Sequence, residues 1–107
     1  MTEPKTISEL MTLVMEESKK GNYNSAIIYL NKAIEIEPND ARFYISRGTF
    51  KVKENDKDAI EDYTKAIEID PNKAYLYNYR AKSKRKLDDN EGADEDDRKA
   101  EKLKNIF

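Results

Sequence analysis

The sequence predicts an all-α fold, a right-handed α-solenoid of three antiparallel helix hairpins, and three observations support this prediction. The segment 33–39 recurs at 66–72 with a single change, Glu37 to Asp70. Alanine pairs seven residues apart recur in register, at Ala26 and Ala33, Ala59 and Ala66, and Ala93 and Ala100. Apolar residues follow helical spacing between turn signals, without a strand pattern. A period near 34 residues that holds two helices is typical of stacked repeats.

The composition fits stacked helices and excludes several kinds of site. The 107 residues correspond to one domain, 1–107, in which charged residues make up 39% and hydrophobic residues 37%. Stacked helices tolerate this balance because each buries only an apolar stripe. The absence of cysteine and histidine excludes disulfides and thiolate metal sites, and removes the most common general base. We therefore expect no enzymatic activity, no cofactor and no metal.

The charge and the hydropathy give no sign of a membrane partner. The formal net charge is only −2, and no apolar run is long enough to cross a bilayer. The first ten residues lack the charged and apolar regions of a signal peptide. We therefore expect a cytoplasmic protein.

Capping and turn residues predict the helices of the first hairpin. Thr6 and Glu9 have the spacing of a capping box, which starts the first helix. Gly21 ends it, because glycine tolerates the left-handed conformation of a helix C-terminus. The second helix is expected over 24–36, since Pro38 disfavours helix in the residue before it.

The second hairpin follows the same logic. Asn39 or Asp40 is expected to cap the third helix, which runs to about Lys53. Asp56 is expected to cap the fourth helix, which ends before Pro71.

The third hairpin is the most polar. Asn72 is expected to cap its first helix, and its second helix is expected from Glu91 to about Lys104. Only Ala100 and Leu103 are apolar between 94 and 104, which suits a terminal helix with one solvent-facing side.

These residues resemble the tetratricopeptide repeat, with repeats at 7–40, 41–73 and 74–107. The resemblance rests on small residues, bulky residues and prolines at recurring places: Leu10, Gly21, Tyr23, Ala26, Leu30, Pro38, Tyr44, Gly48, Ala59, Tyr63, Pro71, Tyr77, Ala81 and Ala93. The third repeat departs from the pattern, because Asp97 stands at an aromatic site and no proline follows. Small residues would let helices approach closely, and the bulky ones would fill the gaps between them.

The resemblance implies a concave groove, lined by the first helix of each repeat, that binds a protein. The expected groove residues are Met11, Met15, Arg42, Ile45, Thr49, Lys53, Tyr75, Asn78, Tyr79, Lys82, Arg85 and Lys86. Methionines adapt to varied apolar partners, so the groove should grade from apolar to aromatic and basic. This gradation predicts a protein or peptide partner with an apolar anchor and an acidic portion. Alternatively, the two methionines pack beneath the N-terminal segment or in a self-contact.

Some members of the family grip the C-terminal carboxylate of heat-shock chaperones with Lys, Asn and Arg. The matching positions here hold Met11, Met15, Ser46, Tyr75 and Tyr79. None of these side chains can replace that clamp, so we expect no binding of this kind.

Two charged segments allow alternative readings. The basic run 80–86 lies beside tyrosines and could contact RNA, hold an acidic peptide, or form a solvated face with internal ion pairs. The acidic segment 88–97 could suggest a calcium site. An EF-hand loop has an oxygen ligand five residues before its glycine, and with Gly92 as that glycine the position is occupied by Leu87, which cannot bind calcium. We expect a solvated helix start there.

The sequence thus predicts a protein–protein interaction module of the scaffold or adaptor type. A second hypothesis is a structural protein that self-associates end to end through Ile7, Met11 or the Phe107 end. An RNA-contacting module is a further alternative.

Overall fold

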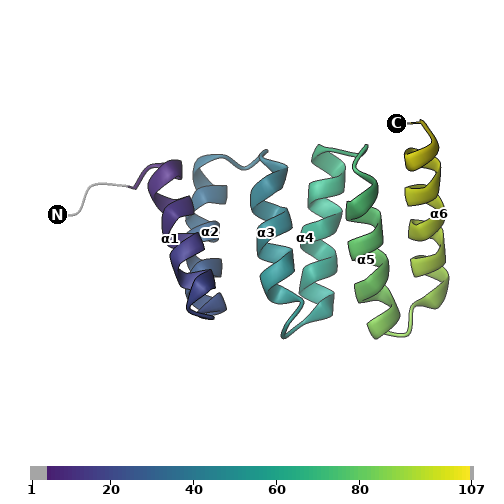
Figure 1. The fold of residues 1–107 in the computed structure, drawn as a ribbon, viewed down its shortest axis with the longest axis horizontal. Helices are drawn as coiled ribbons and strands as arrows, with labels where there is room; N and C mark the ends of the chain where they lie inside the picture. The colour runs from purple at the N-terminus through teal and green to yellow at the C-terminus, as the bar shows by residue number, and fades with distance from the viewer. Residues whose placement is uncertain (1–4, 107) are drawn as a thin grey trace.

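The computed structural model describes residues 5–106, which form six α-helices in three antiparallel pairs and no strand (Figure 1). The helices are α1 Ile7–Lys19, α2 Tyr23–Ile36, α3 Ala41–Lys51, α4 Asp56–Ile69, α5 Ala74–Lys86 and α6 Asn90–Ile106. They stand side by side in a row whose longest dimension is 50 Å. Each helix packs mainly against the helices before and after it in the chain. The predicted all-α arrangement of three hairpins is confirmed.

The predicted start of the first helix is confirmed in atomic detail. The Thr6 Oγ1 atom accepts the Glu9 N–H at 3.1 Å, and Glu9 Oε1 accepts the Thr6 N–H at 3.3 Å. The helix ends at Lys19, two residues before Gly21, whose φ of 80° is the left-handed conformation expected of it. Asp40 caps α3 as predicted, because its Oδ1 accepts the Arg42 N–H at 3.0 Å.

Two predicted caps are wrong. Asn55, and not Asp56, caps α4, and its side chain accepts the Asp58 N–H at 3.3 Å. Asp56 becomes the first helical residue, where its negative charge still favours the helix N-terminus. The cap of α5 is Lys73, without a side-chain bond, and not Asn72.

Small residues lie where the helices approach most closely. Ala26, Ala59 and Ala93 are fully buried. A Cβ atom at Gly48 would lie 3.0 Å from Cε1 of Tyr63, closer than ordinary van der Waals contact. The small residues predicted from the repeat pattern therefore fill the close contacts between helices.

The core consists of two clusters, and each joins neighbouring pairs. Phe43, on α3, completes the first cluster, whose other members come from α1 and α2: Leu10, Val14, Ala26, Leu30 and Ala33. The second cluster contains Leu76, on α5, and six other residues of α3, α4, α5 and α6: Tyr44, Ala66, Ile67, Tyr77, Ala100 and Leu103. The first helix of a pair thus covers apolar surface that the preceding pair leaves exposed.

Two tyrosines fix the turns between pairs. The Tyr44 hydroxyl donates to the Pro38 carbonyl at 2.7 Å, and the Tyr77 hydroxyl donates to the Pro71 carbonyl at 3.0 Å. Both rings are at least 90% buried, so each hydroxyl needs this partner. The same bond therefore ties the first helix of a pair to the turn before it in both places.

The last helix has the polar outer side that the sequence predicts. Ala100 and Leu103 are buried, whereas Ile106 near its end is 71% exposed. The predicted self-association through the Phe107 end falls on residue 107, outside the described residues.

Candidate protein-binding face

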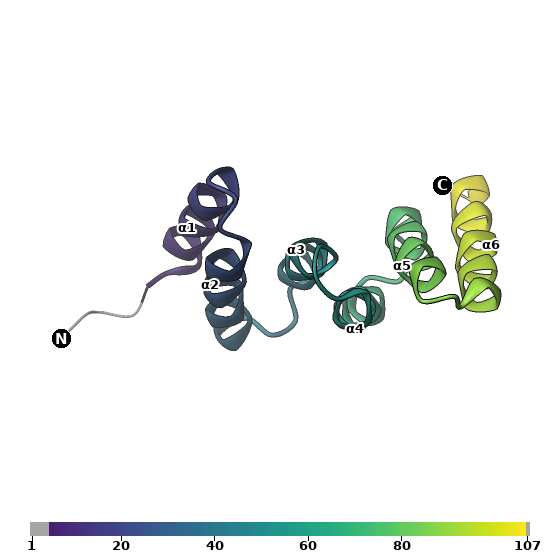
Figure 2. The same ribbon diagram turned by 90° about the horizontal axis from the view of Figure 1, so that it is seen from below.

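The helices α1, α3 and α5 lie along one side of the row, and α2 and α4 lie along the other (Figure 2). The first side carries two hollows. The methionine hollow has a volume of about 320 Å³ and is lined by Met11, Val14, Met15, Ser18, Lys19, Ser46 and Phe50. The tyrosine hollow has a volume of about 260 Å³ and is lined by Thr49, Val52, Tyr63, Tyr79, Lys82, Ser83 and Lys86.

The methionine hollow lies between α1 and α3. Met15 is 59% exposed there, so an apolar partner could bury much of this side chain. Met11 is partly buried against the first core cluster. Phe50 is held in place by stacking on Tyr23, with ring centroids 5.5 Å apart. The hollow therefore combines one free methionine with a fixed apolar floor.

The tyrosine hollow is built from three helices. Tyr63 comes from α4, is 3% exposed, and reaches the hollow across the glycine at position 48. Its ring centroid lies 5.8 Å from that of Tyr79, which in turn lies 5.5 Å from that of Tyr75. Tyr79 is 45% exposed. The result is a row of three aromatic rings beside the two lysines of the hollow.

The donor and the acceptor can be assigned for the hydrogen bonds between hydroxyl groups in the tyrosine hollow. Thr49 Oγ1 donates its only proton to the Ile45 carbonyl at 2.9 Å. In the 3.2 Å contact between Thr49 Oγ1 and the Tyr63 hydroxyl, Tyr63 must therefore be the donor. Tyrosine is protonated at neutral pH, and burial raises the pKa of Tyr63 still further. The hydroxyl of Tyr79 has no recorded hydrogen bond within residues 5–106, so it can donate to a ligand.

The two lysines of the tyrosine hollow differ in their surroundings. Within the described residues Lys82 forms no ion pair, and it is exposed. Lys86 lies 3.9 Å from Asp56 Oδ1, at the limit of an ion pair. That oxygen is buried and accepts no hydrogen bond. The lysine charge at position 86 is thus partly balanced, and the charge at position 82 is not.

The structure brings together only some of the predicted groove residues. Met11 and Met15 share one hollow, and Thr49, Tyr79, Lys82 and Lys86 share the other. Tyr75 lies at the edge of the second hollow through its ring contact.

Besides Tyr75, five predicted groove residues line neither hollow. Arg42 binds Asp40 at 2.7 Å, Lys53 lies 5.0 Å from the ring centroid of Tyr23, and Arg85 binds Asp97 at 2.6 Å. The other two are partly buried, and one of them packs against the second core cluster: Ile45 and Asn78. Apart from Asn78, these residues therefore make contacts within the chain itself.

The sequence reasoning missed the residues that form the floor of the hollows. Tyr63 lies on α4, and the expectation that only leading helices line the groove left it out. Phe50 and Val52 close the hollows from α3 and its C-terminal end. The pairing of Gly48 with a bulky Tyr63 was the available signal, because a missing side chain on the leading helix lets the second helix reach through.

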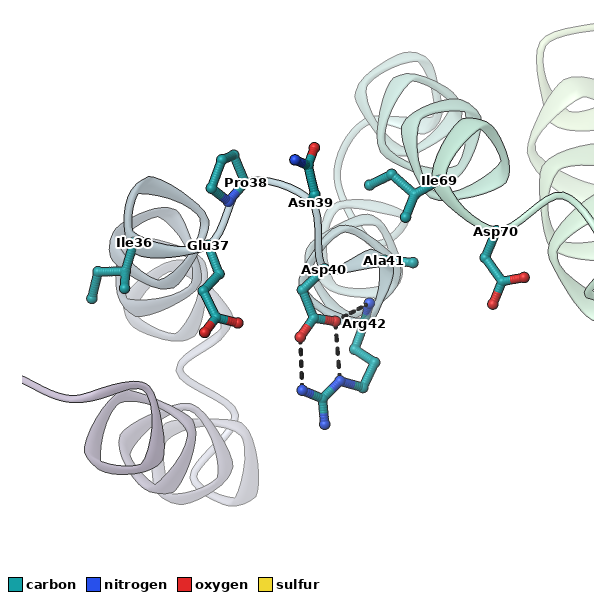
Figure 3. A pocket seen from close by; sticks show the side chains of 9 residues that line it. All are labelled: Ile36, Glu37, Pro38, Asn39, Asp40, Ala41, Arg42, Ile69 and Asp70. Atoms are coloured by element: carbon teal, nitrogen blue, oxygen red, sulfur yellow. Dashed lines mark hydrogen bonds and ion pairs between the residues drawn. The ribbon is translucent and has the colours of Figure 1, made fainter.

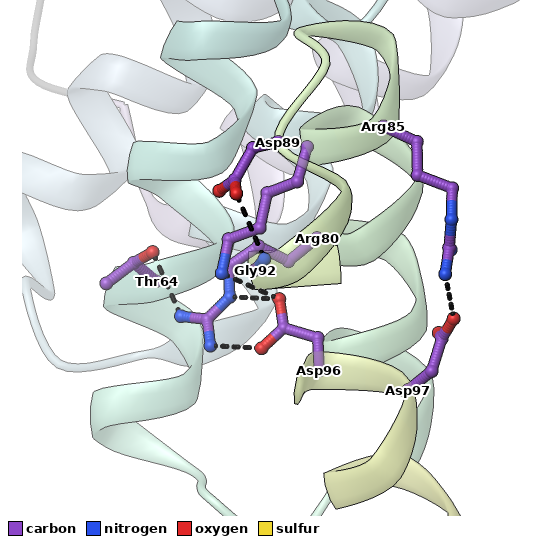
Figure 4. A network of polar contacts seen from close by, with 8 residues as sticks. Thr64, Arg80, Arg85, Asp89, Gly92, Asp96 and Asp97 are labelled. Carbon is purple, nitrogen blue, oxygen red and sulfur yellow. Dashed lines mark hydrogen bonds and ion pairs between the residues drawn. The ribbon is translucent and has the colours of Figure 1, made fainter. Parts of the chain in front are cut away.

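Most of the basic run is engaged in ion pairs within the chain (Figure 4). Arg80 donates two hydrogen bonds to Asp96, at 2.7 and 2.9 Å, and a third to Thr64 at 3.2 Å. Lys84 lies 3.0 Å from the same carboxylate. Burial opposes ionisation of Asp96, but the hydrogen bonds from these two bases outweigh it and lower its pKa below the ordinary value. Of the three readings for this run, the internal ion pairs describe most of its charges.

The same network occurs one pair earlier. Arg47 binds Asp62 at 2.7 and 3.0 Å and donates to Asn31 at 2.9 Å. Lys51 lies 3.4 Å from that carboxylate. Each arginine therefore ties its own pair to the preceding pair, and both networks serve the stacking of the helices.

The acidic segment starts α6 and pairs with α5. Asp89 Oδ1 accepts the Gly92 N–H at 3.0 Å, and Asp97 binds Arg85 (Figure 4). Asp94 also binds Arg85. Among residues 5–106, no group of acidic side chains is placed to hold a metal ion.

A wider hollow of about 660 Å³ lies at the turn between α2 and α3 (Figure 3). Its polar side chains include Glu37, Asp70 and the Asp40–Arg42 pair. Asp40 already caps α3 and binds Arg42, whose hydrogen bond lowers the aspartate pKa. This hollow lacks an aromatic wall and is lined by three acidic side chains, so it is the weaker candidate for an acidic partner.

Over the part of the chain that the structure describes, no helix is both long and apolar enough to span a lipid bilayer.

Solved structures with this fold include proteins described with bound peptides. The second TPR domain of Spaghetti (RPAP3), bound to the HSP90 peptide SRMEEVD, has a TM-score of 0.83 and 20% identity, and 94% of each chain is covered. The TPR2B domain of yeast Sti1, in a complex with pHsp70, has a TM-score of 0.83 and 28% identity, and the match covers 91% of this chain and 78% of that one.

A longer protein also contains this arrangement. MamA from Desulfovibrio magneticus RS-1 has a TM-score of 0.89 and 23% identity, and the match covers 97% of this chain. The chain spans 59% of the length of that MamA protein. No curated protein matches the chain significantly.

The family model of the tetratricopeptide repeat matches residues 10–40 and 41–73, more than half of the chain. The third pair, where Asp97 replaces the expected aromatic residue, lies outside this match. With six helices in the same arrangement as solved tetratricopeptide structures, the chain belongs to the tetratricopeptide repeat family.

Proposed function

We propose that this chain is a protein-interaction module that binds an extended peptide or a partner helix along α1, α3 and α5. The observation that carries the proposal is the pair of hollows on this side of the row, one apolar and one aromatic and basic. No chemistry is needed for this role. Side-chain pockets and a few charges would supply an affinity on the order of 1 μM, about −8 kcal/mol.

The related structures support binding of this general kind. The RPAP3 and Sti1 domains are described in complexes with a peptide of HSP90 and with pHsp70. The present chain has Met11, Met15, Ser46, Tyr75 and Tyr79 at the positions of the heat-shock clamp. We therefore propose a different partner, with an apolar anchor for the methionine hollow and an acidic portion for the tyrosine hollow.

The proposal is tested by selecting displayed random 12-residue peptides on the wild-type protein and measuring their binding by fluorescence. Met15→Glu should weaken the selected peptides at least tenfold, because it places a charge in the apolar hollow. Ile28→Glu is the matched control, since Ile28 is similarly exposed, at 54%, but lies on α2. The peptide SRMEEVD serves as a negative control. Selected peptides that bind Met15→Glu as tightly as the wild type would rule the methionine hollow out.

A further inference from the structure

The charges around the tyrosine hollow do not cancel, and they select one kind of ligand group. Four of the five bases in the segment 80–86 are paired: Arg80, Lys84, Arg85 and Lys86. The fifth, Lys82, forms no ion pair within residues 5–106, and it lines the hollow. The hollow thus carries one unbalanced positive charge.

The hydrogen-bonding groups of the hollow further restrict which chemical group of a ligand can bind there. The Tyr63 hydroxyl donates its only proton to Thr49, so it cannot donate a hydrogen bond to a ligand. The remaining side-chain donors are the ammonium groups of Lys82 and Lys86 and the hydroxyls of Tyr79 and Ser83, of which Ser83 is almost fully buried. All of these donors suit an acceptor group that carries negative charge.

The carboxylate of Asp56 limits how much negative charge the hollow can take. Its buried Oδ1 lies 3.9 Å from Lys86 and has no hydrogen bond. A phosphate, with nearly two negative charges, would leave one of them uncompensated close to this aspartate. A single carboxylate matches the unbalanced charge of Lys82.

We propose that the tyrosine hollow binds the side-chain carboxylate of a glutamate or aspartate in an extended peptide, with Lys82 as its main charge partner. This proposal rests on the proposed function and adds that the acidic portion is a side-chain carboxylate and that Lys82 binds it. The apolar stem of the acidic residue lies against Val52 and the ring of Tyr79, and the apolar anchor of the same peptide lies in the methionine hollow.

The experiment repeats the peptide selection on the wild type, on Lys82→Glu and on Lys99→Glu. Lys99 is an exposed lysine of α6 that lines neither hollow, so it gives the same change of net charge. The wild-type and Lys99→Glu pools should share an acidic residue at a fixed distance from an apolar one. The Lys82→Glu pool should lose this acid and gain lysine or arginine there. Thermal melting followed by circular dichroism is the control for folding, and the three proteins should melt at similar temperatures.

Synthetic peptides with amidated ends then identify the group that binds. Changing the selected glutamate to glutamine should weaken binding to the wild type about tenfold, and should strengthen binding to Lys82→Glu, where the glutamate would face a like charge. Phosphoserine in its place should bind no more tightly than glutamate.

The outcomes separate the two proposals. Selected peptides without an acidic preference, or an unchanged affinity after glutamate becomes glutamine, would overturn the carboxylate assignment and leave the interaction module intact. Phosphoserine binding tenfold more tightly than glutamate would also overturn it. A selection that enriches no peptide at all would contradict the proposed function itself.

Discussion

Replacing Asp96 with alanine is expected to lower the free energy of unfolding by about 3–5 kcal/mol. The Asp96 side chain is 5% exposed and holds Arg80 and Lys84, which are 16% and 19% exposed. Without the carboxylate, two largely buried cations would face each other without a partner. Such a loss is a large share of the about 5–15 kcal/mol that stabilises a typical domain. Urea denaturation followed by circular dichroism measures it.

Asp94→Ala is the matched control for this prediction. Asp94 is two residues away on α6 and binds Arg85, but its side chain is 59% exposed. Exposed ion pairs contribute about 0–1 kcal/mol, so this variant should be nearly as stable as the wild type. Equal losses in the two variants would show that burial of the Asp96 network does not stabilise the stack.

Replacing Phe43 with alanine is expected to cost about 3–5 kcal/mol and to loosen the first helix pair selectively. Phe43 is 1% exposed and lies in the cluster with residues of α1 and α2. In a row of stacked pairs, stability is roughly the sum of each pair and its contacts with neighbours. Losing this side chain removes much of the contact between the first pair and α3.

Hydrogen exchange measures the selectivity of this effect. Amides of α1 and α2 should lose protection in Phe43→Ala, while those of α5 and α6 should change far less. Tyr75→Ala, at a residue 43% exposed on α5, should leave the exchange of α1 and α2 unchanged. Uniform loss of protection over all six helices would contradict a stack held by contacts between neighbouring pairs.

The helices and their packing could be read from the sequence because local signals agreed with the repeat. The Thr6–Glu9 capping box, the small residue at 48 and the prolines at 38 and 71 each specify a local conformation that stacking also requires. The cap of α4 was assigned wrongly because Asn55 and Asp56 are adjacent and both favour the position. The cap of α5 was assigned wrongly because Lys73 makes no side-chain capping bond and the neighbouring Asn72 is the favoured residue type. Only the geometry of the turn decides between them.

The candidate site could be predicted only in part, because pairing between distant charges decides which side chains are free. Nothing in the spacing of 80–86 shows that Arg80 and Arg85 bind α6 while Lys82 does not. A signal was present in the recurrence of the arginine at 47 and 80 and of the aspartate at 62 and 96. Charged residues that keep the register of a repeat favour a shared structural contact.

The most direct test of the protein-binding face is a titration of the ¹⁵N-labelled protein with a selected peptide, followed by NMR chemical shifts. We expect the largest changes at the amides of Met15, Thr49, Tyr79 and Lys82, on α1, α3 and α5. Changes concentrated on α2 and α4, or at the turn 37–42, would contradict the account.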